Sequence, residues 1–525
     1  MLSVEGLSLD IHGSPILRGV SFGIAPGEVF GLVGESGSGK SITALAAMGL
    51  EPRGAEVRGA VGFLDRDLLE VPEPEMNALR GREIGMIFQE PMTALNPVQR
   101  IGDQVAETLV VHGAATRAEA LDVARERLAR VGLPVDRFPL ERYPHELSGG
   151  QRQRVCIAMA VALRPKLLIA DEPTTALDVT TQAQILDLLR GLVAEEGMAL
   201  WLITHDLAVV ADMADHVAVM RDGRVVEADR TERLFRARAH PYTAKLFADS
   251  GHVPARAVQV TATPVLEVRG AVRDYPLPRR TLLGPRPAFR AVDGVDLVVH
   301  AGESVGLVGE SGCGKSTLTR AILGLDVLQG GTVRIDGDAV HARHLDGRVR
   351  AKMQVVFQDP YGSFNPRHRV ERLVAEPFHL DPAPPAAWRP RVAAALEAVG
   401  LRAADGGKYI HEFSGGQRQR IAIARAIVIR PRLVILDEAV SALDVSIRAQ
   451  ILDLLADLQG RFGLSYLFIS HDLSVVRAIT DRVLVMRAGK IVEEGPTERV
   501  FVAPGHAYTR ALIAATPRIP SAWVA

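Results

Sequence analysis

Two short glycine-rich stretches constrain the fold of this chain more than any other feature. Residues 34–41 read Gly-Glu-Ser-Gly-Ser-Gly-Lys-Ser, and residues 309–316 read Gly-Glu-Ser-Gly-Cys-Gly-Lys-Ser. Both fit G-x-x-x-x-G-K-[ST], a loop whose backbone N–H groups surround a phosphate. Apolar residues 29–33 and 305–308 predict a buried strand before each loop, and residues 42–48 predict a helix after the first. This context favours a phosphate-binding loop over an ordinary glycine-rich turn, and its repetition predicts two α/β domains.

A long internal repeat supports the same division. Ser-Gly-Gly-Gln-Arg-Gln-Arg occurs at 148–154 and 414–420, Asp-Glu at 171–172 and 437–438, and His-Asp-Leu at 205–207 and 471–473, each pair 266 residues apart. Phe-Gln, followed by an acidic residue and proline, occurs at 88–91 and 357–360. Ordered motifs that return in register indicate a duplicated domain. Lys40 and Lys315 of the two loops are 275 residues apart, so the second copy opens with a longer segment.

We predict a first domain at 1–252, a linker at 253–264 and a second domain at 265–525. Residues 2–24 alternate as antiparallel strands do, whereas 97–131, 181–192 and 231–247 have the apolar spacing of helices. Residues 276–287 contain four prolines and three arginines. They predict a solvated loop between strands, with contact to a phosphate-bearing partner as the alternative. Residues 381–385 predict another loop.

The composition places the chain among ordinary globular proteins. It has 525 residues, of which 47% are hydrophobic and 23% charged, and its net charge is −1. A net charge near zero gives no overall basic field for nucleic acid or anionic lipid. We find no signal peptide, and no apolar run reaches the roughly 18 residues of a membrane span. Cys156 and Cys313 are too few for a disulfide framework or a four-cysteine metal site. We expect a cytoplasmic protein, with peripheral membrane attachment through a partner left open.

The residues around the loops indicate phosphoryl chemistry. Asp171 and Glu172 end an apolar run, as do Asp437 and Glu438. The aspartate suits Mg²⁺, and the glutamate suits a general base or positioner of the attacking water. A carboxylate pair that caps the next turn is the alternative. Gln89 and Gln358 have amides able to touch both the metal and the water. His205 and His471 follow apolar runs, where a lone histidine is usually structural, but here each can donate a hydrogen bond to a γ-phosphate.

The two Ser-Gly-Gly-Gln stretches resemble the signature motif of ATP-binding cassette (ABC) ATPases, and the resemblance covers nearly the whole chain. It implies an α/β fold of two tandem ABC-type P-loop NTPase domains. Each domain would have a RecA-like core, an antiparallel β subdomain and a helical signature subdomain. A small-residue loop that opens a helix offers N–H groups and a dipole to an anion. In this family each ATP lies between one domain's phosphate loop and the other domain's signature.

The resemblance implies two such composite sites, formed by intramolecular pairing of the two domains. Ala176-Leu177-Asp178 and Ala442-Leu443-Asp444 resemble the D-loops that couple the sites. We expect ATP and Mg²⁺ as cofactors and hydrolysis at both sites. Site one comprises Gly34, Ser36, Gly37, Gly39, Lys40, Ser41, Ile42, Gln89, Asp171, Glu172 and His205, closed by Ser414, Gly415, Gly416 and Gln417. Site two comprises Gly309, Ser311, Gly312, Gly314, Lys315, Ser316, Thr317, Gln358, Asp437, Glu438 and His471, closed by Ser148, Gly149, Gly150 and Gln151. The metal ligands would be Ser41, Gln89 and Asp171 in site one and Ser316, Gln358 and Asp437 in site two.

Two positions depart from a symmetric pair. Tyr275 fits the aromatic residue that stacks on adenine in this family, and the first-half position is Ile11, beside His12. Weaker stacking in site one would cost about 1 kcal/mol, as aromatic contacts do. Ala439 stands where the first half has Pro173. That change alters a turn and leaves the carboxylates in place, so we expect hydrolysis to survive.

Finer features resemble the peptide/nickel importer branch. They are residues 89–97 and 358–366, 143–146 before the first signature, and His-Pro-Tyr-Thr at 240–243, which Gly-His-Ala-Tyr-Thr echoes at 505–509. The branch implies an ATPase that energises import of peptides or related small solutes. Its partners would be two transmembrane permeases and, indirectly, a substrate-binding protein. The chain would lie peripherally on the cytoplasmic face of the inner or plasma membrane. Segments 93–101 and 362–370 would contact the permeases, with packing inside their own domains as the alternative. The branch often carries an iron–sulfur centre, and with two cysteines we expect none here.

A soluble tandem ATPase that acts on ribosomes or nucleic acid is the alternative. Ribosome-acting relatives usually carry a long charged helical linker, whereas the join here is short. DNA-repair relatives usually carry zinc-binding cysteines or coiled-coil insertions. The near-zero net charge also gives no electrostatic footprint for RNA or DNA, so we expect no nucleic-acid partner. The transported solute is not encoded in motifs of this chain.

Overall fold

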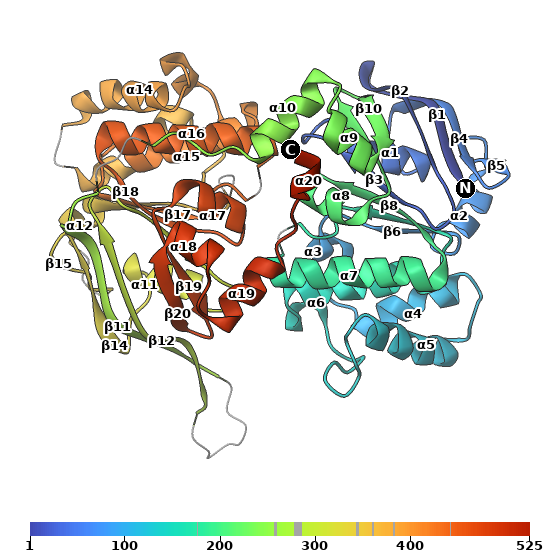
Figure 1. Ribbon diagram of the computed structural model, residues 1–525, viewed down its shortest axis with the longest axis horizontal. Coiled ribbons are helices and arrows are strands. Elements are labelled where there is room, and N and C mark those ends of the chain that lie inside the picture. Colours follow the sequence, from blue (N-terminus) through green and yellow to red (C-terminus); the bar gives the residue numbers. More distant parts are fainter. Residues whose placement is uncertain are drawn as a thin grey trace. The chain divides into compact units, whose positions relative to one another are not determined.

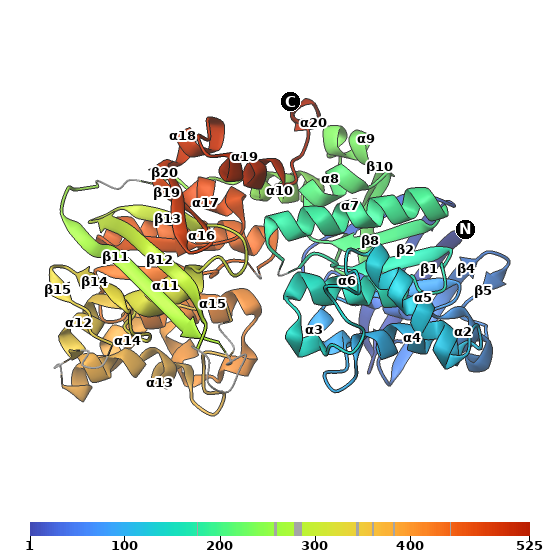
Figure 2. The ribbon, with the colours of Figure 1, turned by 90° about the horizontal axis from the view of Figure 1, so that it is seen from below.

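The computed structural model describes residues 1–175, 177–256, 260–277, 286–342, 346–359, 362–381, 384–441 and 443–524. They form two compact units: residues 1–251 with the segment from Pro517 onwards, and residues 252–516. Each unit contains a four-stranded antiparallel sheet and a mostly parallel six-stranded sheet. Helices lie around the sheets of both units (Figures 1 and 2). The predicted duplication of an α/β domain is confirmed.

The first unit places its strands in two sheets. The antiparallel sheet has the order β2-β1-β4-β5 and contains β1 (Leu2–Ile11), β2 (Ser14–Ile24), β4 (Ala55–Phe63) and β5 (Arg66–Asp67). The six-stranded sheet has the order β10-β9-β3-β8-β7-β6 and contains β3 (Val29–Val33), β6 (Ile84–Ile87), β7 (Leu167–Asp171), β8 (Ala199–Thr204), β9 (His216–Arg221) and β10 (Arg224–Arg230). Strands β3, β7 and β8 are buried along their whole length, as expected for parallel strands covered on both faces.

Two apolar clusters lie on opposite faces of this sheet. Leu167 and Ile169 of β7 pack with the antiparallel sheet, whereas Leu168 and Ala170 pack with the helices. Successive side chains of a strand point to opposite faces, so a continuous apolar strand serves both layers. The helices of the first unit are α1 (Lys40–Ala47), α2 (Glu73–Leu79), α3 (Pro91–Ala94), α4 (Ile101–Val111), α5 (Arg117–Arg130), α6 (Gly149–Ala160), α7 (Val179–Glu196), α8 (Leu207–Met213), α9 (Thr231–Ala237) and α10 (Pro241–Ser250).

The second unit repeats this topology. Its antiparallel sheet has the order β12-β11-β14-β15, with β11 (Pro264–Pro276), β12 (Ala288–His300), β14 (Gly330–Ile335) and β15 (Asp338–Ala339). Its six-stranded sheet has the order β16-β17-β18-β13-β19-β20, with β13 (Ser304–Val308), β16 (Met353–Val356), β17 (Leu433–Asp437), β18 (Ser465–Ile469), β19 (Arg482–Arg487) and β20 (Lys490–Pro496). The helices are α11 (Lys315–Ile322), α12 (Gly347–Lys352), α13 (Val370–Val374), α14 (Trp388–Ala398), α15 (Gly415–Ile427), α16 (Val445–Phe462), α17 (Leu473–Ile479), α18 (Thr497–Val502) and α19 (Ala507–Ala514).

Local expectations hold for most elements and need refinement at a few. The predicted helix at 231–247 is two helices, because Arg238 adopts a left-handed conformation and Pro241 starts α10 under an N-cap from His240. Strand β12 begins at Ala288, directly after the loop predicted at 276–287; residues 278–285 of that loop lie outside the described residues. The same holds for residues 382–383 in the other predicted loop. Among the described residues, no helix is long and apolar enough to cross a bilayer.

The compact units divide the chain differently from the predicted domains at two places. The described parts of segment 253–264 belong to the second unit. The C-terminal helix α20 (Ser521–Val524) belongs to the first unit and packs on α9 (Figure 1). The ring of Trp523 meets that of Phe235 edge-on, with ring centres 5.8 Å apart. The bounds 1–252, 253–264 and 265–525 therefore stay a prediction for the functional domains.

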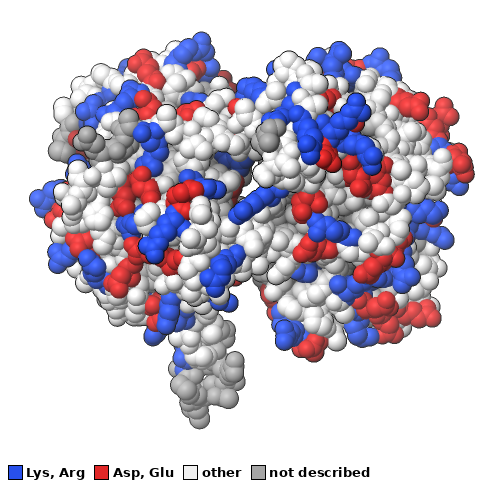
Figure 3. Space-filling model, viewed as in Figure 1, with Lys and Arg blue, Asp and Glu red and all other residues white. Residues whose placement is uncertain are grey.

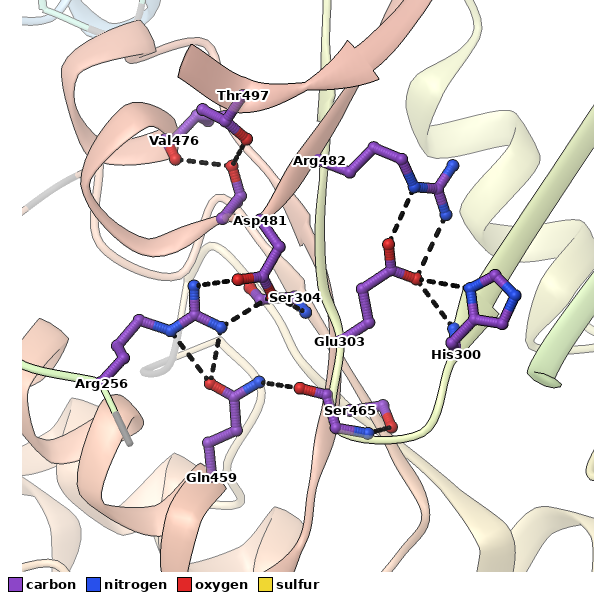
Figure 4. A network of polar contacts seen from close by, with 12 residues as sticks. Arg256, His300, Glu303, Ser304, Gln459, Ser465, Val476, Asp481, Arg482 and Thr497 are labelled. Atoms are coloured by element: carbon purple, nitrogen blue, oxygen red, sulfur yellow. Dashed lines mark hydrogen bonds and ion pairs between the residues drawn. The ribbon is translucent and has the colours of Figure 1, made fainter. Parts of the chain in front are cut away.

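A polar network fastens the linker to the second unit (Figure 4). The Arg256 guanidinium donates to both carboxylate oxygens of Asp481 at 2.9 Å and to the Gln459 side-chain oxygen at 3.1 Å. Gln459 in turn donates to the Gly302 carbonyl at 2.9 Å, and Asp481 accepts from the Ser304 N–H at 2.8 Å. Because Ser304 is the first residue of strand β13 and Gly302 lies two residues before it, the network ties the linker to the strand that leads into the second phosphate loop.

We predict that Arg256→Ala destabilises the second unit by about 1–3 kcal/mol, because the variant leaves the fully buried Gln459 amide oxygen and the surface carboxylate of Asp481 without their charged donor. Thermal unfolding of the full chain measures the change. Arg461→Ala is the matched control, since Arg461 and Asp457 form an exposed ion pair, and such pairs contribute about 0–1 kcal/mol. Equal stability losses in the two variants would contradict the prediction.

Candidate nucleotide-binding sites

The candidate residues lie at one edge of each six-stranded sheet. Strands β3, β6, β7 and β8 are parallel, so their carboxyl ends meet at the same edge. The phosphate loop follows β3, Gln89 follows β6, Asp171 ends β7 and His205 follows β8. Strands β13, β16, β17 and β18 place the corresponding residues of the second unit in the same way. Residues separated by more than 160 positions, such as Lys40 and His205, are thereby gathered at one edge.

Each phosphate loop is pressed against a neighbouring strand. A Cβ on Gly34 would lie 2.3 Å from the Met220 carbonyl oxygen at the end of β9, and a Cβ on Gly309 would lie 2.2 Å from that of Met486. Only glycine fits at such an approach to backbone. Gly39 and Gly314 precede helices α1 and α11 with φ of 104° and 114°, values that disfavour other residues.

The loop lysines are buried within their own loops. The Lys40 ammonium donates to the carbonyl oxygens of Gly34 at 2.8 Å and Glu35 at 2.9 Å. Lys315 donates to Gly309 at 2.6 Å and Glu310 at 3.0 Å. The ammonium group of each lysine is therefore held inside its loop by two carbonyl oxygens, which places a positive charge where the loop would surround a phosphate.

The aspartates that end β7 and β17 are buried carboxyl groups. Burial raises the pKa of Asp171 to about 6 against the opposing hydrogen bond from Ser41, which donates to Asp171 at 3.0 Å. Burial and the neighbouring Glu438 raise the pKa of Asp437 to about 6. The Ser41 hydroxyl and the Asp171 carboxylate offer adjacent hard oxygen atoms, which are the ligands that Mg²⁺ prefers. The donor set in the first unit thus fits this ion.

Glu172 lies at the centre of the first site. It accepts hydrogen bonds from the Gln89 amide at 3.0 Å and the Thr175 hydroxyl at 2.8 Å, and it pairs with the His205 ring at 3.2 Å. Burial raises the pKa of Glu172, but hydrogen bonds from His205 and Thr175 outweigh it and lower the pKa to about 2. Its backbone is left-handed, with φ of 47°, and its N–H bonds to the Ile203 carbonyl of β8. The tertiary structure holds this strained residue in place.

The second site brings together the same residue types with fewer contacts. Glu438 has φ of 51° and pairs with His471 at 3.3 Å. Burial raises the pKa of Glu438, but the hydrogen bond from His471 outweighs it and the net shift is downward. Among the described residues, no hydrogen bond joins Gln358 to Glu438, and the Ser441 hydroxyl donates to the Glu438 backbone carbonyl. The two sites therefore share a plan and differ in how firmly the glutamate is held.

The signature residues lie at helix starts. Ser148 caps α6 in a reciprocal box with Gln151: the Ser148 N–H donates to the Gln151 side chain at 2.9 Å, and the Gln151 N–H donates back at 3.4 Å. Ser414 and Gln417 form the same box at α15. Gln151 and Gln417 thus act as helix caps within their own units. The first N–H groups of each helix, those of the glycines between them, have no carbonyl partner within the helix.

The predicted adenine-stacking positions are equivalent by strand register. Leu2 of β1 pairs with Phe63, and Leu266 of β11 pairs with Ile335, which places Ile11 and Tyr275 at matching ends of the two strands. The Tyr275 hydroxyl donates to Asp326 at 2.9 Å, and the Arg273 guanidinium lies 4.4 Å from its ring centre. Ile11 is partly buried against the apolar cluster of the first unit. The first unit therefore has an isoleucine at the place in β1 where the second unit has a tyrosine in β11, as the sequence predicted.

Thr175 is a site residue that sequence reasoning missed. Its hydroxyl donates to Glu172 at 2.8 Å. The sequence signal that could have found it is a hydroxyl residue three positions after the glutamate, which Ser441 matches in the second unit.

Of the predicted D-loops, Ala176 and Ala442 lie outside the described residues. Asp178 caps α7 by accepting from the Thr181 N–H at 3.0 Å.

Two phosphate loops, each with adjacent carboxylates, a glutamine and a histidine at the edge of a parallel sheet, define a tandem P-loop ATPase. Comparison with known protein families supports this class. The family described as "ABC transporter" matches residues 17–175 and 292–441. The family described as "Oligopeptide/dipeptide transporter, C-terminal region" matches residues 492–524.

Relatives align over nearly the whole chain. The peptidoglycan transport ATP-binding protein YejF of Agrobacterium fabrum is 47% identical, covering 98% of this chain and 96% of its own. The glutathione import ATP-binding protein GsiA is 46% identical both in Salmonella paratyphi A and in Escherichia coli K12, each covering 98% of this chain and 89% of the relative. The chain belongs to the ATP-binding proteins of ABC transporters, as its signature motifs predicted.

We predict that Gly34→Ala destabilises the first unit by about 2–4 kcal/mol and abolishes nucleotide binding there, because the new methyl group overlaps a backbone carbonyl that cannot move away. Thermal unfolding and binding of a fluorescent ATP analogue to the full chain measure both effects. Gly251→Ala is the control, since a Cβ at Gly251 meets nothing within 4 Å. Native-like nucleotide binding by Gly34→Ala would show that the loop closes in another way.

Proposed function

We propose that the chain hydrolyses ATP at two sites to drive import of peptides or related small solutes through an ABC transporter. The observation that carries the proposal is that both units keep a complete set of loop lysine, aspartate, glutamate, glutamine and histidine at one sheet edge. The match of residues 492–524 to an oligopeptide/dipeptide transporter region supports the peptide class. So do relatives whose names refer to peptidoglycan transport and glutathione import.

The loop would bind the phosphates of ATP. Backbone N–H groups of 34–41 and 309–316, including those of Ser36, Gly37, Gly39, Ser311, Gly312 and Gly314, would donate to phosphate oxygens, and Lys40 and Lys315 would neutralise their charge. Ser41, Gln89 and Asp171 would hold Mg²⁺ in site one, and Ser316, Gln358 and Asp437 in site two. The ion supplies charge neutralisation at the β- and γ-phosphates.

Glu172 and Glu438 would position the attacking water. The low pKa of Glu172 keeps its carboxylate ionised at neutral pH, so it accepts the water's hydrogen bonds and orients a lone pair toward phosphorus. His205 and His471 are each bonded to the glutamate through Nδ1, and the opposite ring nitrogen of each would donate a hydrogen bond to the γ-phosphate. Gln89 would share the water with Glu172, which its 3.0 Å bond to that carboxylate supports.

The proposal further pairs the two domains around ATP, as in the family. Ser414 and Gly416 would close site one, and Ser148 and Gly150 would close site two. ATP then favours the closed form, and hydrolysis favours the open form, so the nucleotide shifts the conformation by its differential affinity. The N–H groups at the starts of α6 and α15, which have no carbonyl partner within their helices, support a role in anion contact.

Grooves beside the two glutamines support contact with permeases. A cavity of about 860 Å³ in the second unit is lined by Gln358, Gly362 and Ser363 among others, and one of about 310 Å³ in the first is lined by Phe88 and Ala94. These residues lie in or beside segments 93–101 and 362–370. The partners would be two transmembrane permeases and, indirectly, a substrate-binding protein, with the chain peripheral on the cytoplasmic face of the membrane. Positive and negative side chains are mixed over the face in Figure 3, a distribution that suits docking to protein better than to nucleic acid.

We predict that Glu172→Gln combined with Glu438→Gln lowers steady-state hydrolysis by a factor of about 10²–10⁴, the usual loss on removing a general base. ATP binding persists, because the loops are unchanged. Phosphate release measures hydrolysis, and retention of radiolabelled ATP on a gel-filtered chain measures binding. Substantial turnover by the double variant would refute the assignment of these residues.

We predict that the chain, reconstituted with its cognate permeases in lipid, hydrolyses ATP faster when a peptide-loaded binding protein is added. The measurement is the ATPase rate with loaded, empty and absent binding protein. Ribosomes and duplex DNA serve as competing stimulators in parallel reactions. Stimulation by either of these, together with no response to the loaded binding protein, would favour the soluble class of tandem ATPase.

A further inference from the structure

We propose that Tyr242 and Tyr508 are positioning residues for the two phosphate loops. They belong to the His-Pro-Tyr-Thr and His-Ala-Tyr-Thr elements that open helices α10 and α19, for which the hydrolytic mechanism has no role. The Tyr242 hydroxyl oxygen accepts a hydrogen bond from the Glu35 backbone N–H at 3.3 Å. The Tyr508 hydroxyl oxygen accepts one from the Glu310 N–H at 3.0 Å. Glu35 and Glu310 are the second residues of their loops.

The peptide unit involved is the one that also faces the loop lysine. A peptide group is planar and trans, so its N–H and C=O point in opposite directions. The group between Gly34 and Glu35 donates its N–H to Tyr242 and offers its carbonyl oxygen to the Lys40 ammonium at 2.8 Å. In the second unit the group between Gly309 and Glu310 joins Tyr508 to Lys315 at 2.6 Å. Each tyrosine thereby fixes the orientation of the carbonyl that holds the lysine.

Both tyrosines are held rigidly enough to do this. Their side chains are buried, with 5% and 6% of each residue exposed. The guanidinium of Arg221 lies 4.9 Å from the Tyr242 ring centre, and that of Arg487 lies 4.8 Å from the Tyr508 ring centre. Arg221 and Arg487 are the last residues of strands β9 and β19. The methionine just before each arginine has the backbone carbonyl that packs against the first glycine of the loop. The ring is thus wedged beside the loop independently of its hydroxyl group.

The helix starts are themselves anchored to the neighbouring strand. His240 caps α10 through a bond from the Tyr242 N–H at 3.1 Å, and Glu227 of β10 accepts from the His240 N–H at 3.1 Å. The second unit repeats both contacts: His506 accepts from the Tyr508 N–H at 3.1 Å, and Glu493 of β20 accepts from the His506 N–H at 3.0 Å. The two helices also share a buried leucine, Leu246 and Leu512, which serves packing, whereas the shared tyrosines contact the loops.

Through these tyrosines, helices α10 and α19 would each influence how tightly the phosphate loop of their own unit binds ATP. Tyr→Phe removes one hydroxyl group and leaves the wedged ring, so the loop peptide loses its outer partner while the fold persists. Because one neutral hydrogen bond is lost, we expect the KM for ATP, and the Kd of a fluorescent ATP analogue, to rise about three- to tenfold. The value of kcat should change less than about twofold, since the carboxylates and histidines are untouched.

The experiment uses the full chain with Tyr242→Phe, Tyr508→Phe and both changes together. Steady-state ATPase assays give KM and kcat, and hydrogen exchange measured by mass spectrometry gives amide protection at residues 30–40 and 305–315. We expect faster exchange in the first loop for Tyr242→Phe and in the second loop for Tyr508→Phe, without nucleotide present. The exchange result does not depend on hydrolysis, so failure of this inference can be told apart from failure of the proposed function.

Tyr466→Phe is the matched control. The Tyr466 hydroxyl is buried and donates to the Leu455 carbonyl at 2.9 Å, away from the loop, so Tyr466→Phe also removes one buried hydrogen bond between a tyrosine hydroxyl and the backbone. We expect this variant to lower the melting temperature and leave both KM and loop exchange unchanged. The inference is overturned if the Tyr242 and Tyr508 variants behave like the control, with lower stability but native KM and native loop exchange.

Discussion

The site depends on one close packing contact, in which the first glycine of each phosphate loop lies against the backbone of the strand beside it. Gly34 meets the Met220 carbonyl at the end of β9, and Gly309 meets that of Met486 at the end of β19. This contact is available only because β3 and β9 are hydrogen-bonded neighbours, and because glycine brings no Cβ. Once the loop is closed in this way, its carbonyl oxygens converge on the lysine and its helix begins at the sheet edge, so the phosphate-binding geometry follows from how the strands are ordered.

Two adjacent carboxyl groups acquire opposite properties at that edge. Asp171 is the last residue of a buried strand and its pKa rises to about 6, whereas Glu172, turned aside by a left-handed backbone, is bonded by three donors and its pKa falls to about 2. Two neighbouring groups with separated pKa values are a common basis for distinct roles in one site. The second unit reproduces the pattern with His471 as the partner of Glu438, and without a bond between Gln358 and Glu438 among the described residues. The two candidate sites therefore share one arrangement, and among the described residues Glu172 has more hydrogen-bond donors than Glu438.

Much of the fold was predictable, and the residues proposed for each site do gather at one sheet edge, for identifiable reasons. The strand expected at 29–33 is β3 without change, because an apolar run between a turn and a glycine loop has few alternatives. The helix expected at 231–247 is broken, because a left-handed Arg238 and the proline at 241 compete with the apolar periodicity. Thr175 escaped prediction because its contact with Glu172, three residues away, depends on the geometry of the loop. Tyr242 escaped prediction because it reaches Glu35 from a helix more than 200 residues along the chain. No local pattern encodes such a distance.

The sequence by itself determined the chemistry, since the loops, carboxylates, glutamines and histidines recur in a fixed order, and that order suffices to define an ABC-type ATPase. It also determined the duplication, through motifs spaced 266 residues apart. Tertiary structure alone decided which hydrogen-bond donors each glutamate has and which tyrosines reach the loops. It also decided that the linker is bonded to Asp481 and Gln459 and that helix α20 packs on α9. The physical reason is that residue type limits what a group can do, whereas burial, orientation and partners arise only when distant segments pack together.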